Sequence, residues 1–181
     1  MVSTRRQAIE RSALADAYPV GYCARWVRTM YGVDPSGDAD RDGDVDAADS
    51  WKRATHKHAN DRFPPPGVPV YWSGGRSGHG HIAISWAGGR IRGTDSPNAG
   101  HVGTVDLEWV EKNWGLKYVG WSEDIHGALI PVDAVPLPKK QRPADVRAAI
   151  KNLTNRLLTA GPVEARRIRE VIAKLRKINK R

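Results

Sequence analysis

The chain of 181 residues is poor in cysteine, methionine and phenylalanine, and these shortages exclude some classes of protein. One cysteine, Cys23, cannot form an internal disulfide, so the fold does not depend on the disulfide framework of small secreted domains. No stretch approaches the roughly 18 unbroken apolar residues of a membrane-spanning helix. Basic residues near the N-terminus have no apolar run behind them, so we expect no secretory signal and synthesis in the cytoplasm.

The whole chain has a formal net charge of +9, and its positive charge is concentrated in the C-terminal part. Residues 1–138 hold 15 Lys and Arg against 17 Asp and Glu, whereas residues 139–181 hold 14 against 3. Such a basic segment can meet nucleic acid, an anionic cell wall or an acidic protein, and charge alone does not choose among them. All seven tryptophans precede residue 122, which indicates that the globular core lies in the first part.

The only cysteine lies where a helix is predicted to begin. Trp26, Val27 and Met30 follow Cys23 on one face of a helix that Gly32 can end. In a first helical turn, unpaired N–H groups and the helix dipole favour a thiolate and lower the pKa of a cysteine. This position predicts an activated nucleophile, although a lone cysteine can also be a small buried core residue.

Residues 38–49 match a calcium-binding loop of the EF-hand type. Gly43 provides the sharp turn, Val45 is the apolar residue that follows it, and Asp44 also supplies the backbone carbonyl. Without a cation these carboxylates would repel one another, which argues against a merely solvated acidic loop. The end of the loop is similar to dockerin repeats, but one copy does not support a paired, cohesin-binding dockerin. The predicted calcium ligands are Asp38, Asp40, Asp42, Asp44, Asp46 and Asp49.

A β-hairpin is predicted to bring a histidine next to an aspartate. His81 begins an alternating strand, and residues 90–95 return as its partner after a three-residue turn at residues 87–89. In that register His81 stands opposite Asp95, where a carboxylate can hold the imidazole by a hydrogen bond. A two-residue turn would instead place Ser96 there, so the assignment of Asp95 depends on the turn.

Other elements follow from the same periodicities. Residues 4–7 have the form of a capping box and predict a first helix that ends by Tyr18. Most tryptophans are expected in the core, with one or two lining a substrate groove. His56 and His58 are expected on the surface of a helix. The remaining predicted segments are helices over residues 49–60 and 105–114 and strands over residues 68–72 and 117–121.

The C-terminal part is predicted to be a separate helical unit. Residues 131–143 form a proline-punctuated linker, and residues 144–181 form a basic helical hairpin broken at residues 159–162. Two helices bury their apolar stripes poorly alone, so the hairpin is expected to dock on a protein partner or to self-associate. An anionic membrane is a further alternative, and no nucleic-acid partner is expected.

The order of these motifs resembles the CHAP family of cysteine/histidine-dependent amidohydrolases and peptidases. The resemblance covers about residues 10–125. It is carried by Gly21-Tyr22-Cys23-Ala24-Arg25-Trp26-Val27, the strand from Gly67 to Trp72, Gly80-His81-Ile82-Ala83-Ile84 and the acid on the next strand. It implies a papain-like α+β fold over residues 1–130, with N-terminal helices and an antiparallel sheet.

The resemblance also implies a function. Cys23 would be the nucleophile, His81 the base and Asp95 the third member of the triad, with Tyr22 as a candidate oxyanion donor. Family members mostly cleave peptidoglycan, and some phage members carry a calcium loop after the nucleophile helix. We therefore expect an amidase or endopeptidase acting at the bacterial cell wall, free as a phage lysin or mounted on a virion. The alternative is a calcium-stabilised structural or adaptor protein with an inactive papain-like domain.

Overall fold

The computed structural model describes residues 1–35, 37–39, 41–133, 150–151, 153–155, 165, 168–173 and 176. The chain divides into two units, Met1–Asp133 and Ala134–Arg181. The described residues of the second unit are helical, and Ala165, Ile168 and Ile172 are buried. Most of the predicted linker and hairpin lies outside the described residues.

An antiparallel six-stranded sheet organises the first unit, in the order β1-β6-β2-β3-β4-β5. A two-stranded ribbon, β7-β8, stands beside it. The α+β class with an antiparallel sheet, predicted from the sequence, is confirmed. The elements are α1 (Arg5–Ala13), α2 (Cys23–Tyr31), α3 (Ala47–Arg53), β1 (Lys57–Ala59), β2 (Pro69–Ser73), β3 (His81–Trp86), β4 (Arg90–Thr94), β5 (Val102–Asp106), α4 (Trp109–Trp114), β6 (Lys117–Ser122), β7 (Asp124–Ile125) and β8 (Ala128–Leu129).

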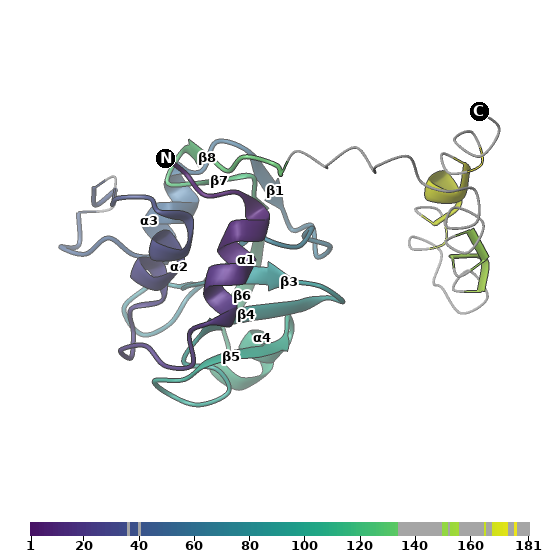
Figure 1. Cartoon of the computed structure of the whole chain (residues 1–181). Coiled ribbons are helices and arrows are strands. Elements are labelled where there is room, and N and C mark those ends of the chain that lie inside the picture. Colours follow the sequence, from purple (N-terminus) through teal and green to yellow (C-terminus); the bar gives the residue numbers. More distant parts are fainter. Residues whose placement is uncertain are drawn as a thin grey trace. The chain divides into compact units, whose positions relative to one another are not determined.

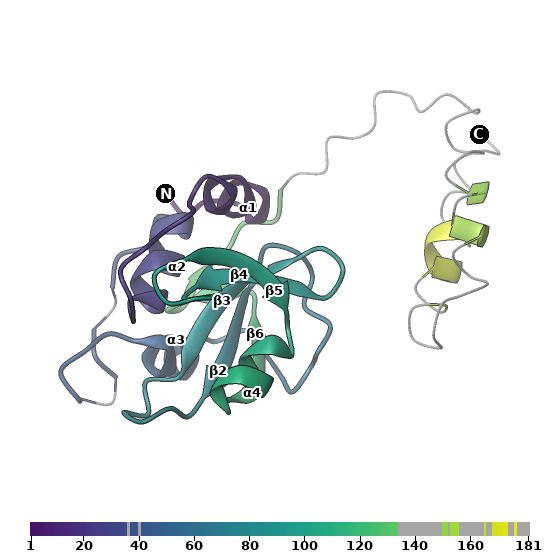
Figure 2. The same cartoon turned by 90° about the horizontal axis from the view of Figure 1, so that it is seen from below.

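Helices cover both faces of the sheet. Helices α1, α2 and α3 lie on one side and α4 lies on the other (Figures 1 and 2). Successive side chains of a strand point to opposite faces. Tyr71 and Ile82 therefore enter the core under α2, whereas Val70 and Ala83 enter the core under α4. The central strands are buried on both faces, which explains why residues 81–85 are all buried.

Local signals place the N-terminal helices. Thr4 and Gln7 form the predicted capping box at the start of α1, with the Thr4 hydroxyl accepting a hydrogen bond from the Gln7 N–H. Gly32 ends α2 in the left-handed conformation, with φ of 66°. Both predictions are confirmed. Helix α2 packs on β3 through Trp26 and Val27, and this contact holds Cys23 against the sheet.

Two predicted helices are too long. The helix expected over residues 49–60 ends at Arg53, because the N–H groups of Thr55 and His56 donate to the carboxylate of Asp124, 2.8 Å away in each case. The chain then continues as edge strand β1. The helix expected over residues 105–114 begins only at Trp109, because Val105 and Asp106 pair with β4.

The last described residues of the first unit pack against its beginning. The carboxylate of Asp133 accepts hydrogen bonds from the Thr4 hydroxyl at 2.5 Å and from the Arg6 N–H at 2.9 Å. Residues 131–133, which the sequence analysis counts in the linker, thus contact the start of α1. Among the described residues, no helix is long and apolar enough to cross a membrane.

Candidate active site

The predicted nucleophile and base line one pocket. Cys23 is the first residue of α2 and is 9% exposed, and His81 is the first residue of β3 and is 5% exposed. Both line a pocket of about 420 Å³, together with Asp95. The structure therefore brings the three predicted catalytic residues together, although they come from three separate segments.

Aromatic rings fix the imidazole of His81. The edge of the His81 ring meets Trp114 with centroids 4.8 Å apart, and Trp72 lies on another side at 5.8 Å. Gly93 of β4 lies beside the ring, and a Cβ atom there would be in ordinary contact with His81 Nε2 at 3.5 Å but crowded against the Cβ of Ala83 at 3.1 Å. Among the described residues, this buried Nε2 has no hydrogen-bond partner.

Burial decides the protonation states of both groups. It raises the pKa of the Cys23 thiol to about 11, although the backbone N–H groups of Ile82 and Ala24 oppose this shift. Burial also lowers the pKa of His81 to about 4, against the smaller opposing effect of the Asp95 charge. The expectation that the helix N-terminus lowers the pKa of Cys23 is wrong here, because loss of solvation outweighs it. At neutral pH the site holds a neutral thiol and a neutral imidazole.

Asp95 contacts the nucleophile turn rather than the imidazole. The three-residue hairpin turn is confirmed, because Trp86 pairs with Arg90 and the strands continue in that register. At the end of β4, however, Asp95 adopts a φ of 60° and leaves the strand. Its carboxylate accepts hydrogen bonds from the N–H groups of Gly21 at 3.1 Å and Gly100 at 2.8 Å. The predicted hydrogen bond between His81 and Asp95 is absent from the described contacts.

Tyr22, the candidate oxyanion donor, precedes the nucleophile at the N-cap of α2. Its side chain is 53% exposed and lines a second groove that also reaches Cys23. The backbone N–H of Tyr22 donates to the carbonyl of Pro19 at 3.4 Å. Because its backbone N–H is already used, Tyr22 could act as an oxyanion donor only through its phenol group.

The acidic loop folds around its own carboxylates. Asp38 accepts hydrogen bonds from the N–H groups of Arg41 and Gly43, and Gly43 has the φ of 101° that the sharp turn requires. Asp49 is fully buried and accepts the N–H groups of Ala39 at 2.5 Å and Asp46 at 3.1 Å, from the two ends of the loop. Asp44 is exposed, and Asp40 lies outside the described residues. Carboxylate oxygens are ligands that suit a hard cation such as calcium, but in the described part of the chain the one group of three whose ligand atoms converge is Asp42, Asp46 and His79.

His79, which belongs to none of the sequence motifs, contacts this loop and also lines the pocket of Cys23 and His81. Its Nε2 lies 3.1 Å from Asp42 Oδ2, and its Nδ1 lies 4.0 Å from Asp46 Oδ2. The carbonyl of His79 also accepts the Ala48 N–H of α3 at 3.0 Å. His79 stands two residues before His81 in a glycine-rich segment whose only sequence signal was its flexibility.

Comparison of the chain with protein-family models, curated proteins and solved structures found no match.

Proposed function

We propose that the chain is a peptidoglycan hydrolase that uses Cys23 as nucleophile and His81 as base. The observation that carries the proposal is the shared pocket, which is lined by the first residue of α2 and the first residue of β3. The family resemblance supplies the substrate class. A helix bearing the cysteine, packed on an antiparallel sheet that bears the histidine, is also consistent with a papain-like arrangement.

The neutral resting state favours a general-base mechanism. As the Cys23 sulfur attacks the amide carbonyl carbon, its proton passes to His81. Because the thiol pKa is raised and the imidazole pKa is lowered in the free protein, this transfer depends on stabilisation of the imidazolium in the substrate complex. The carbonyl oxygen becomes an oxyanion, held by the Cys23 backbone N–H with the Tyr22 phenol as second donor. Hydrogen bonds between catalytic groups often tighten only in the substrate complex, so a direct bond in the free enzyme is not required.

The second half of the reaction returns the enzyme to its starting state. Collapse of the tetrahedral intermediate breaks the C–N bond, and His81 gives its proton to the leaving amine. A thioester on Cys23 remains. Water then gives a proton to His81 as its oxygen attacks the thioester carbon, the C–S bond breaks, and His81 returns the proton to the leaving sulfur, which releases the carboxylic acid and restores the thiol. Asp95 acts in this scheme by holding the turn before Cys23, since its carboxylate contacts Gly21.

Calcium is the cofactor we propose for residues 38–49. Asp38, Asp40, Asp42, Asp44, Asp46 and Asp49 would hold the ion, and its charge would offset the repulsion among these carboxylates. The Ala48 N–H to His79 carbonyl bond joins the end of the loop to the segment before His81. Order in the loop would thereby support the position of the base.

An inactive calcium-stabilised adaptor is the second candidate. The raised pKa of the Cys23 thiol favours this candidate, because the thiol is not ionised in advance for attack on a substrate. Digestion of purified peptidoglycan, with the released fragments weighed by mass spectrometry, tests both candidates. The proposed hydrolase releases fragments cut at one type of amide bond, and the Cys23→Ser variant releases none. Intact peptidoglycan after incubation with folded, calcium-loaded protein would favour the adaptor. The site of action expected for the hydrolase is the bacterial cell wall.

A further inference from the structure

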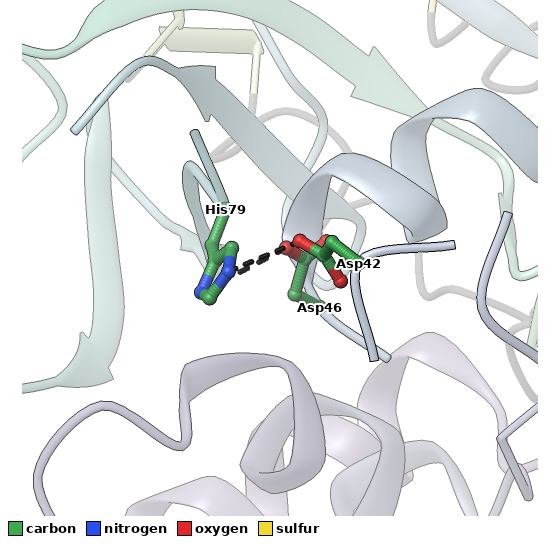
Figure 3. A group of neighbouring side chains, drawn as sticks. All are labelled: Asp42, Asp46 and His79. Atoms are coloured by element: carbon green, nitrogen blue, oxygen red, sulfur yellow. Dashed lines mark ion pairs between the residues drawn. The ribbon is translucent and has the colours of Figure 1, made fainter. Parts of the chain in front are cut away.

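We propose that Asp42, Asp46 and His79 form a binding site for a zinc-like transition-metal ion, which competes with calcium for the two carboxylates. The ligand atoms of the three side chains all lie within 4.8 Å of one another. In Figure 3 the imidazole of His79 faces the carboxylates of Asp42 and Asp46. The two aspartates belong to the acidic loop, and the histidine belongs to the loop before β3.

One of the distances is already that of a coordinated ion. Ligand atoms around a tetrahedral zinc ion with bonds of about 2.0–2.1 Å lie about 3.3 Å from one another. Nε2 of His79 lies 3.1 Å from Asp42 Oδ2, whereas the 4.0 Å contact to Asp46 Oδ2 is made by the other ring nitrogen, Nδ1. An ion bound to one nitrogen therefore needs the ring or one carboxylate to turn, within a group whose ligand atoms lie within 4.8 Å of one another. Three protein ligands leave a fourth position for water.

Each carboxylate is oriented by its second oxygen. Asp42 Oδ1 accepts the Asp44 N–H at 3.1 Å, and Asp46 Oδ1 accepts the Asp49 N–H at 2.9 Å. In both residues it is Oδ2 that lies toward His79. Hydrogen bonds of this kind to ligating groups fix their direction and are a recurrent feature of metal sites.

The imidazole determines which ion the site prefers. Calcium is bound by oxygen ligands, whereas a nitrogen with two carboxylates suits zinc and neighbouring transition metals. The side chains of His79, Asp42 and Asp46 are 40%, 33% and 11% exposed, so an ion can reach them from solvent. Two negative charges and a neutral imidazole also balance a divalent cation. Since calcium would use the same two aspartates, the two ions cannot be bound fully at once.

Zinc titration by calorimetry tests the site in the full-length chain. The Cys23→Ser background is used throughout, because the thiolate is itself a zinc ligand. His79→Gln should weaken zinc binding at least tenfold, and Asp42→Asn should do the same. His58→Gln is the matched control, because His58 Nε2 lies 3.0 Å from a single carboxylate, that of Glu123, and zinc binding should be unchanged.

Calcium titrations complete the test, and none of these measurements depends on hydrolysis. Saturating calcium should lower the apparent zinc affinity of the background protein, while His79→Gln should retain its calcium affinity. Unchanged zinc affinity in His79→Gln, or an equal loss in His58→Gln, would overturn the proposed site. A loss of zinc affinity in Asp42→Asn but not in His79→Gln would indicate an all-oxygen site and would also overturn the proposal. Zinc affinity that does not change when calcium is added would overturn it as well.

Discussion

The carboxylate of Asp95 accepts a hydrogen bond from the backbone N–H of Gly21, with 3.1 Å between the two atoms. The same carboxylate accepts the N–H of Gly100 at 2.8 Å. One side chain therefore joins the end of β4 to the turn that delivers Cys23 to the start of α2. In the proposed mechanism, this contact makes Asp95 a positioning residue for Cys23.

Substitution of Asp95 should reveal this positioning role. We expect Asp95→Ala to destabilise the protein by about 1–2 kcal/mol, because two backbone N–H groups lose their acceptor. Asp95→Asn keeps an acceptor oxygen and should retain more hydrolytic activity and stability than the alanine variant. Urea unfolding and peptidoglycan clearing measure the two effects. Equal loss of activity in both variants, with stability kept in Asp95→Asn, would mean that the effect of the negative charge of Asp95 on His81 matters instead.

Alkylation of the single cysteine should report its raised pKa. Because burial raises the pKa of Cys23 to about 11, the rate of reaction with iodoacetamide should rise about tenfold per pH unit across the neutral and mildly alkaline range. Mass spectrometry follows the reaction at one site, since the chain has no other cysteine. A rate that is already level below neutral pH would reveal a thiolate paired with an imidazolium.

His81 should make the folded state sensitive to acid. Its pKa is lowered to about 4 in the folded protein, whereas an unfolded histidine titrates near 6.5. The unfolded state therefore binds the extra proton first, and stability falls as the pH drops from about 6.5 to about 4. His81 alone should account for about 3 kcal/mol of this loss. Urea unfolding across this range should show a shallower pH dependence for His81→Gln than for the parent, and identical slopes would contradict the buried, neutral imidazole.

Calcium should stabilise the first unit through the acidic loop. At a hundredfold excess over the dissociation constant, binding adds about 2.7 kcal/mol to the free energy of unfolding, so the melting temperature should rise by about 5 °C or more. Asp38→Asn keeps an acceptor for the Gly43 N–H but removes a ligand charge, and it should abolish most of the rise. Asp34→Asn, an exposed position just before the loop, is the control. Equal melting with calcium and with chelator would refute the calcium assignment.

The basic tail should be dispensable for chemistry and required for delivery. A chain ending at Pro138 should cleave soluble peptidoglycan fragments at the parent rate but should sediment less with intact walls. Binding that weakens steeply with salt would indicate attraction to anionic wall polymers, whereas binding that resists salt would indicate docking through the apolar stripes. Equal wall binding by the full and shortened chains at every salt concentration would exclude a delivery role.

Local patterns predicted the parts of the site that depend on neighbours in sequence. The start of α2 at Cys23, its end at Gly32 and the three-residue hairpin turn all follow from residues within a few positions of one another. Such signals do not depend on tertiary packing, so they can be recognised in a single sequence. The antiparallel sheet was instead expected from the family resemblance, since some of its strand pairs, such as β2 with β6, join segments far apart in the sequence.

Long-range contacts account for what the sequence analysis missed. The helix after the acidic loop ends early because Asp124 binds the N–H groups of Thr55 and His56 from the far side of the first unit. Burial of Cys23 under the sheet reverses its expected pKa shift, and no local pattern encodes that burial. His79 gave no signal, because its partners in the acidic loop are distant in sequence and its own segment has no periodicity.

The hydrogen bond from the Ala48 N–H to the His79 carbonyl joins the acidic loop to the segment that carries the base. If this hydrogen bond couples binding at the loop to binding at the pocket, the coupling free energy is the same in both directions. Whatever factor a cation in the loop applies to the affinity for substrate, bound substrate must apply the same factor to the affinity for the cation. If an ordered loop favours substrate binding, as the proposed mechanism implies, contact with the wall polymer and capture of the ion would reinforce each other, and the protein would hold its ion most firmly where that substrate is found.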